Sequence, residues 1–260
     1  MAFSHIQFEA REGIALITID RPQKRNALSL ETLDELGHAF EEVGDDATLK
    51  ALIITGEGDK AFAAGADIKE LATADAMASL ELSHFGQRQF RMLETLRKPS
   101  VAAINGNAFG GGLELAMACS IRFAVPEALL GQPEVKLGTT PGYGATQRLP
   151  QLIGRGRALE MLISAEPVSA TEALATGLVN RIVPRADLLT FSHEWLRKCL
   201  KHGTQAIGLT MEAVDVGFAQ GSEAGFRYES AAFGLIASTE DRAEGIRAFL
   251  EKRDPIFTGS

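Results

Sequence analysis

The sequence is poor in the residues that build disulfide frameworks and metal sites. Only two cysteines occur in 260 residues, Cys119 and Cys199, and they lie far apart and outside any metal-ligand spacing. The five histidines form no close-spaced pair. This pattern is typical of a protein with reduced thiols and indicates neither a disulfide-stapled fold nor a metal centre. We therefore expect a cytoplasmic protein without a bound metal.

Long hydrophobic runs and a surplus of basic residues are also missing. No apolar stretch approaches the roughly 18–20 residues that a membrane-spanning helix needs, and residues 1–8 lack the basic and apolar parts of a secretion signal. The net charge of −8 argues against a general basic surface for nucleic acid. We expect no nucleic-acid partner and no membrane partner. A chain of this length, 45% hydrophobic, fits one large domain or a domain with an appendage.

Three common catalytic and nucleotide-binding motifs are absent. The chain has no G-x-G-x-x-G after a first strand, no G-x-x-x-x-G-K-[ST], and no G-x-S-x-G around any serine. A dinucleotide fold, a P-loop and an esterase nucleophile are therefore not supported.

The pattern along the chain predicts strands that alternate with helices. Short β-type runs over 6–10 and 14–20 flank a turn and indicate a hairpin, and Ser29 is placed to cap a helix. Further expected elements are strands at 51–56, 101–106, 121–125 and 128–130, and helices at 76–96 and 112–119. Strands separated by helices of this length predict an α/β fold with parallel crossovers.

From about residue 186 onward the pattern becomes helical only. The expected helices cover 188–200, 205–219, 223–236 and 239–252. Apolar residues such as Val214 and Phe218 in a polar setting indicate an apolar face. Burial against another subunit and burial in an intramolecular core are equally consistent with that face.

The most informative segments each combine glycine with a glutamate. Gly110-Gly111-Gly112 precedes Glu114 at the start of an apolar helix, and Glu134 follows Gly131-Gln132-Pro133 in what reads as a loop. A triple glycine lets a ligand approach the backbone and its free N–H groups. Two facing carboxyl groups are suited to general acid–base chemistry on a carbonyl compound. Each glutamate alone also has a structural explanation. The Glu114 carboxylate would interact favourably with the dipole of its helix, and Glu134 would be a solvated loop residue.

A third segment, residues 60–70, is rich in alanine and glycine and contains Asp67, a reasonable helix cap. Its small residues leave backbone N–H groups uncovered, so it is suited to supply one donor for a developing oxyanion while the triple glycine supplies another. Segments of this composition are common, and alone the pattern is weak.

Together these segments resemble the crotonase superfamily, and specifically its enoyl-CoA hydratases. The resemblance extends in the right order from Arg21-Pro22 and Asn26-Ala27-Leu28 to the last helix. It rests on residues 61–69, 103–106, 110–116, 131–134, 146–149, 173–183, 240–245 and 249–253. It implies an α/β fold: a spiral of repeated ββα units over residues 1–195, the catalytic core. It also implies a C-terminal helical region over residues 196–260 that forms homotrimers, often paired into hexamers.

The resemblance also implies a reaction, the reversible addition of water across the 2,3 double bond of a 2-trans-enoyl-CoA. The thioester oxygen would lie between the backbone N–H groups of Ala66 and Gly111. Glu114 would position and activate the water, and Glu134 would supply the proton to C2. The coenzyme A is part of the substrate, so no separate cofactor is implied.

Further residues would contact the CoA thioester. Pantetheine is expected along the loop that contains Ala64, Ala66, Asp67, Ile68 and Lys69, with further contacts from Gly110, Pro133 and Gly142. Basic candidates for the nucleotide phosphates are Lys24, Arg25 and, from the last helix of this or a neighbouring subunit, Lys252. Asn107, Leu113 and Tyr143-Gly144-Ala145 depart from the residues frequent in hydratases, so acyl chain length is left open.

Three alternatives compete with a hydratase. An isomerase of the same superfamily is associated with a single carboxylate at the Glu134 position, and the presence of Glu114 favours hydration. Other crotonase chemistries, namely hydrolysis, dehalogenation and decarboxylation, usually replace one of the two glutamates. A non-catalytic acyl-CoA scaffold or an RNA-binding member is disfavoured by the charge of −8 and by the intact pair.

Overall fold

The computed structural model describes residues 3–260, and two sheets organise its core. The larger sheet has the order β1-β2-β3-β5-β7-β10, in which β1 is antiparallel to β2 and all other neighbours are parallel. Its strands are β1 (Ile6–Arg11), β2 (Ile14–Ile19), β3 (Ala51–Gly56), β5 (Ser100–Ile104), β7 (Ile121–Ala124) and β10 (Arg181–Ile182). The predicted hairpin and the predicted parallel crossovers are therefore confirmed.

The smaller sheet has the order β4-β6-β8-β9 and is built from strands of two or three residues. These are β4 (Ala61–Ala63), β6 (Asn107–Phe109), β8 (Leu129–Gly131) and β9 (Val168–Ser169). β4, β6 and β8 each follow a strand of the larger sheet and precede a helix or helical turn. The chain thus repeats a ββα unit and alternates between the two sheets, as the spiral fold requires.

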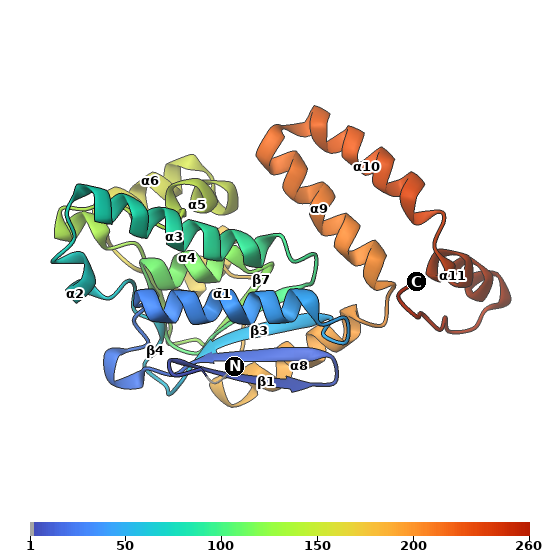
Figure 1. The fold of residues 1–260 in the computed structure, drawn as a ribbon, viewed down its shortest axis with the longest axis horizontal. Coiled ribbons are helices and arrows are strands. Elements are labelled where there is room, and N and C mark those ends of the chain that lie inside the picture. Colours follow the sequence, from blue (N-terminus) through green and yellow to red (C-terminus); the bar gives the residue numbers. More distant parts are fainter. Residues whose placement is uncertain (1–2) are drawn as a thin grey trace.

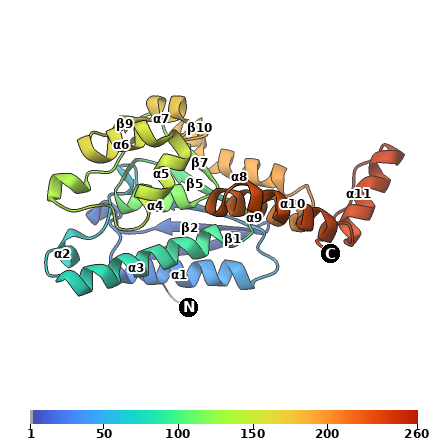
Figure 2. The ribbon, with the colours of Figure 1, turned by 90° about the horizontal axis from the view of Figure 1, so that it is seen from above.

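Helices cover the sheets and close each repeat (Figures 1 and 2). α1 and α3 lie side by side over the larger sheet, whereas α4 is buried along its whole length because its residues are almost all apolar. The helices of the core are α1 (Leu30–Asp45), α2 (Ile68–Leu71), α3 (Ala76–Glu94), α4 (Gly111–Ala118), α5 (Ala145–Ile153), α6 (Arg155–Ser164), α7 (Ala170–Thr176) and α8 (Leu188–Cys199). Single 3-10 turns are η1 (Pro22–Lys24), η2 (Glu134–Leu137) and η3 (Arg185–Asp187).

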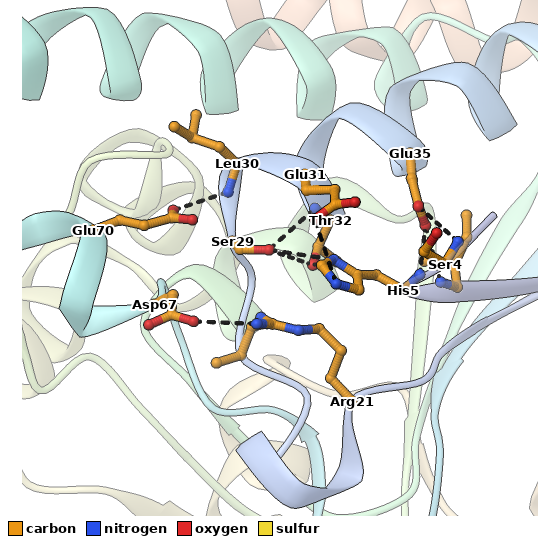
Figure 3. Close-up of polar contacts among 12 residues, drawn as sticks. Ser4, His5, Arg21, Ser29, Leu30, Glu31, Thr32, Glu35, Asp67 and Glu70 are labelled. Atoms are coloured by element: carbon orange, nitrogen blue, oxygen red, sulfur yellow. Dashed lines mark hydrogen bonds and ion pairs between the residues drawn. The ribbon is translucent and has the colours of Figure 1, made fainter.

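Local chemistry accounts for where α1 begins. Ser29 accepts a hydrogen bond from the backbone N–H of Thr32 at 3.3 Å, which is the predicted cap. His5 adds a contact of 3.1 Å between its Nδ1 and the Thr32 hydroxyl, and Glu70 of α2 accepts from the N–H of Leu30 at 2.9 Å (Figure 3). The start of α1 is therefore held both by the residue that precedes β1 and by α2.

The last three helices form an arm that extends away from the core (Figures 1 and 2). The arm comprises α9 (Thr204–Gln220), α10 (Ser222–Ile236) and α11 (Glu240–Glu251), with α9 and α10 packed as a hairpin. The boundary expected between residues 195 and 196 lies inside α8, where Trp195 packs on Phe123 of β7 at 5.8 Å between ring centroids and Leu196 is fully buried. α9, which begins at Thr204, is the first helix of the arm.

Within residues 3–260, none of the helices combines the length and apolar character needed to cross a membrane.

Candidate active site

Glu114 enters the site from the first turn of α4 and is 1% exposed. Its Oε1 accepts two hydrogen bonds, from the backbone N–H groups of Tyr143 and Ala145, each at 2.8 Å. The pKa of Glu114 is raised to about 7, mainly by burial and also by the nearby charge of Glu134, although the two N–H donors lower it. A buried carboxyl that exchanges a proton near neutral pH is suited to acid–base chemistry.

Glu134 begins η2, a 3-10 turn, so the expectation of a plain loop at this position is wrong. Burial raises the pKa of this carboxyl as well. With the side-chain amide of Gln132 oriented nitrogen toward Glu134, Nε2 donates to the two carboxylate oxygens at 2.9 and 3.1 Å. Gln132 is itself 1% exposed, so this contact fixes the carboxyl from the buried side.

The backbone of the triple glycine is in close contact with the Glu134 carboxylate and with β4. Gly110 has φ +49° and ψ −126°, a conformation that side chains disfavour, and a Cβ added there would lie 2.7 Å from Oε1 of Glu134. A Cβ on Gly112 would lie 2.1 Å from the carbonyl oxygen of Ala63 in β4. Glycine at these positions therefore lets α4 approach both β4 and the Glu134 carboxylate.

Two backbone N–H groups converge beside these glycines. A Cβ added to Gly111 would lie 3.4 Å from the nitrogen of Ala66, and one added to Gly65 would lie 3.9 Å from the nitrogen of Gly111. Within residues 3–260, neither the Ala66 N–H nor the Gly111 N–H donates to another protein group. Adjacent free donors of this kind are the parts of an oxyanion hole.

The loop that contains Ala66 is held in place from the N-terminal part of the chain. Leu28 donates to Gly65 at 2.8 Å and accepts from the N–H of Asp67 at 2.9 Å, which forms a parallel bridge around Ala66. The guanidinium of Arg21 pairs with the Asp67 carboxylate at 3.2 Å, and both side chains are less than one-fifth exposed (Figure 3). Asp67 also caps α2, as predicted, by accepting from the N–H of Lys69.

Most of the expected substrate contacts lie around this loop. Ala64 donates to the carbonyl of Arg25 at 3.1 Å, so η1, with Lys24 and Arg25 exposed at its end, adjoins the loop. Ile68 and Lys69 are exposed at the start of α2. Pro133 precedes Glu134 as the residue before η2.

Two expected contact residues, Gly142 and Lys252, lie outside this loop. The carbonyl of Gly142 accepts from Ser83 at 2.6 Å and from Gln87 at 2.9 Å, both of α3. Lys252 ends α11, which Figure 1 shows at the far end of the arm from β4 and α2. Within one chain the structure therefore does not bring Lys252 to the site.

The sequence did not indicate several neighbours of the predicted site residues. The N–H groups of Tyr143 and Ala145, the Gln132 amide and the Arg21–Asp67 pair all contact or support the predicted residues. Gln132 stands two residues before Glu134, and that proximity was the one available signal. The backbone donors carry no sequence signal, because any residue type provides them.

Comparison with known proteins identifies the family. A sequence profile described as enoyl-CoA hydratase/isomerase matches residues 9–260. The chain belongs to the enoyl-CoA hydratase/isomerase family. It is 44% identical to the crotonyl-CoA hydratase of Syntrophomonas wolfei, over 99% of both chains, and 40% identical to the short-chain-enoyl-CoA hydratase of Clostridium acetobutylicum, over 97% of both.

A solved structure agrees with this assignment. The crystal structure of an enoyl-CoA hydratase from Bacillus anthracis superposes with a TM-score of 0.94 at 38% identity, and covers 99% of this chain and 100% of its own. The predicted family and the crotonase-type α/β fold are therefore confirmed. As a member of the enoyl-CoA hydratase/isomerase family, the chain is an enzyme of acyl-CoA metabolism.

Proposed function

We propose that this chain is an enoyl-CoA hydratase in which Glu114 and Glu134 act together as acid and base. It adds water reversibly across the 2,3 double bond of a 2-trans-enoyl-CoA and gives a 3-hydroxyacyl-CoA. The observation that carries the proposal is the convergence of two carboxyl groups with raised pKa on two free backbone N–H groups. An isomerase needs one carboxylate, and the fully built second one favours hydration.

The oxyanion hole supplies the electrostatic part of the reaction. The thioester oxygen accepts hydrogen bonds from the N–H groups of Ala66 and Gly111. Negative charge grows on this oxygen as water adds to C3, and preorganised donors in a buried site stabilise that charge by several kcal/mol. The bridge around Ala66 and the first turn of α4 fix the two donors before substrate binds.

The two glutamates move the protons. Ionised Glu114 orients a water molecule and takes one of its protons as the oxygen bonds to C3, and protonated Glu134 then delivers a proton to C2. Two N–H donors on Oε1 favour the charged form of Glu114. In the state that reacts with the enoyl thioester, Glu114 is therefore ionised and Glu134 is protonated, and dehydration runs the same steps in reverse.

The CoA moiety is proposed to lie along the 64–69 loop, with Ile68 and Lys69 exposed toward it and Gly110, Pro133 and Gly142 near the acyl end. Lys24 and Arg25 adjoin that loop and are proposed to bind nucleotide phosphates. Lys252 joins them only if a neighbouring subunit contributes α11. These steps require no group beyond the protein and the thioester, so extensive dialysis against EDTA is expected to leave activity unchanged.

The arm is proposed to assemble the chain into a homotrimer, alone or as a pair of trimers. Large apolar side chains stand exposed on it, including Phe233 (79%), Phe249 (82%) and Leu250 (75%). Exposed apolar surface of this extent is typical of an interface between subunits. The division proposed is thus a catalytic core followed by an assembly arm from about Thr204.

Labelled water tests the reaction directly. The protein is incubated with crotonyl-CoA in ¹⁸O-enriched water, and the products are analysed by mass spectrometry. The proposal expects 3-hydroxybutyryl-CoA that carries one labelled hydroxyl. An isomerase would instead move the double bond of crotonyl-CoA to the 3,4 position or return crotonyl-CoA unchanged, in both cases without incorporating label, and that result would replace the proposal.

A further inference from the structure

Behind the site, an ion pair joins α3 to α5. The guanidinium of Arg148 contacts both carboxylate oxygens of Glu94, through Nε at 2.5 Å and Nη2 at 3.1 Å. The two side chains are only 14% and 20% exposed. A two-point, mostly buried contact between guanidinium and carboxylate fixes the plane of the guanidinium and therefore the direction of its remaining donor.

That remaining donor points at the turn that holds Glu114. Nη1 of Arg148 donates to the carbonyl oxygen of Tyr143 at 2.6 Å, and the N–H groups of Tyr143 and Ala145 donate to Glu114. Between them, Gly144 has φ +116°, and a Cβ there would lie 2.2 Å from Nη1 of Arg148. The turn is therefore shaped around the guanidinium as well as around the carboxylate.

We infer that Arg148, held by Glu94, is a positioning residue that fixes the Tyr143–Ala145 turn so that its two N–H groups aim at Oε1 of Glu114. Glu94 holds Arg148, Arg148 holds the turn, and the turn holds the proposed base. The inference rests on the proposed function for its effect on turnover. Its effect on the protonation of Glu114 is independent of turnover.

The charges around Glu114 determine in which direction each substitution should shift its pKa. The charged or titratable groups that face it are Glu134 of η2 and Arg148 of α5, with the phenol of Tyr143 beside the turn. Strands β4, β5 and β6, which pack against α4, carry no titratable side chain. From α3, Glu94 lies behind Arg148, and Arg91 of α3 and Asp215 of α9 face Glu94 in turn.

Two substitutions should therefore act in opposite directions on protonation. Arg148→Met removes a positive charge that lowers the pKa of Glu114, so that carboxyl should hold its proton to higher pH. Glu94→Gln keeps one side-chain oxygen that can accept from Arg148 and removes the negative charge beside the guanidinium, so Glu114 should lose its proton at lower pH. Damage to the fold alone would move both variants the same way.

The kinetic test uses crotonyl-CoA across pH. For Arg148→Met we expect kcat to fall roughly 10- to 100-fold with little change in KM, because misplacement of the proposed base leaves CoA binding intact. The acid limb of the kcat profile should move to higher pH in Arg148→Met and to lower pH in Glu94→Gln. Arg148→Lys keeps the charge and loses the two-point contact, so its limb should stay near the wild-type position while kcat falls.

Arg91→Met is the matched control, since Arg91 contacts the same Glu94 at 3.4 Å but is 59% exposed and, within residues 3–260, donates no hydrogen bond to the turn. Arg91→Met should keep the wild-type kcat and the wild-type position of the acid limb in the kcat profile. Circular dichroism and size-exclusion profiles establish that each variant is folded. Folded Arg148→Met and Glu94→Gln proteins whose limbs shift in the same direction, or stay in place, would overturn the inference.

A substrate-free measurement separates this inference from the proposed function. The infrared band of the protonated Glu114 carboxyl, taken as the difference between wild type and Glu114→Gln, is followed against pH in each variant. Opposite shifts in Arg148→Met and Glu94→Gln are expected even if the chain hydrates no enoyl-CoA. Unmoved titration in both variants contradicts the inference whatever the activity.

Discussion

Glu134 lies directly against the backbone of Gly110, where a Cβ would stand 2.7 Å from Oε1 of the carboxylate. The same glycine has φ +49°, a conformation from which side chains are nearly excluded. The glycine is thus required both by the local backbone and by the carboxylate that lies on it. This contact places the Glu134 carboxylate beside the first turn of α4, the turn that contains Glu114.

Substituting Gly110 should therefore disable the site at a moderate cost in stability. Gly110→Ala is expected to reduce kcat at least tenfold, because the methyl group displaces Glu134, and to lower the free energy of unfolding by about 1–3 kcal/mol through backbone strain. Crotonyl-CoA kinetics and urea unfolding measure the two effects. Gly156→Ala is the control: nothing lies within 4 Å of its added methyl group, and both quantities should stay near wild type. Full activity in Gly110→Ala would contradict the placement of Glu134.

The buried Glu114 carboxyl predicts a pH-dependent stability. Its pKa is raised from 4.5 to about 7, so between these values the folded protein holds a proton that the unfolded chain releases. The free energy of unfolding therefore falls as pH rises through this window, by a few kcal/mol at most. Glu114→Gln cannot ionise and still offers an oxygen to the two N–H donors. It should be more stable than wild type at pH 8 and gain little at pH 4.5.

Urea unfolding of both proteins at the two pH values measures this difference. An advantage of Glu114→Gln that is the same at pH 4.5 and pH 8 would show that burial of charge is not its cause.

Part of the fold could be predicted from local patterns. The hairpin β1–β2, the cap at Ser29 and the extent of α3 follow from alternation, capping chemistry and periodicity. Of the smaller sheet, the local pattern predicts only β8, as a strand at 128–130, because strands of two or three residues such as β9 are too short to show a period. Here the family resemblance, and not the local pattern, provided the spiral.

Part of the site could be predicted from the sequence and part could not. Glu114 and Glu134 stand out because a carboxyl beside glycine or within an apolar helix needs an explanation. The contact between Glu94 and Arg148 joins residues 54 positions apart, and charge alone does not say which partners meet. The boundary at residues 195 and 196, which the family resemblance implies, falls inside α8, where Leu196 is buried in the core.

The exposed apolar side chains of the arm predict an assembly that charge can disrupt. Phe249→Glu and Leu250→Glu on α11 are expected to shift the protein from trimer or hexamer toward smaller species in size-exclusion chromatography with light scattering, because charge is costly to bury in an apolar interface. Arg242→Glu, at an exposed charged position of the same helix, serves as the control. A wild-type protein that is monomeric at micromolar concentration would contradict the proposed role of the arm.

The central claim is that Glu114 and Glu134 act together on an enoyl thioester. Its most direct test is the loss of enoyl-thioester absorbance when crotonyl-CoA is added to wild type, Glu114→Gln and Glu134→Gln, with CoA binding measured in parallel. The account predicts rapid loss with wild type and a decrease of at least 100-fold in kcat for each variant, with fold and CoA binding retained. A variant that binds CoA and keeps wild-type turnover would contradict it.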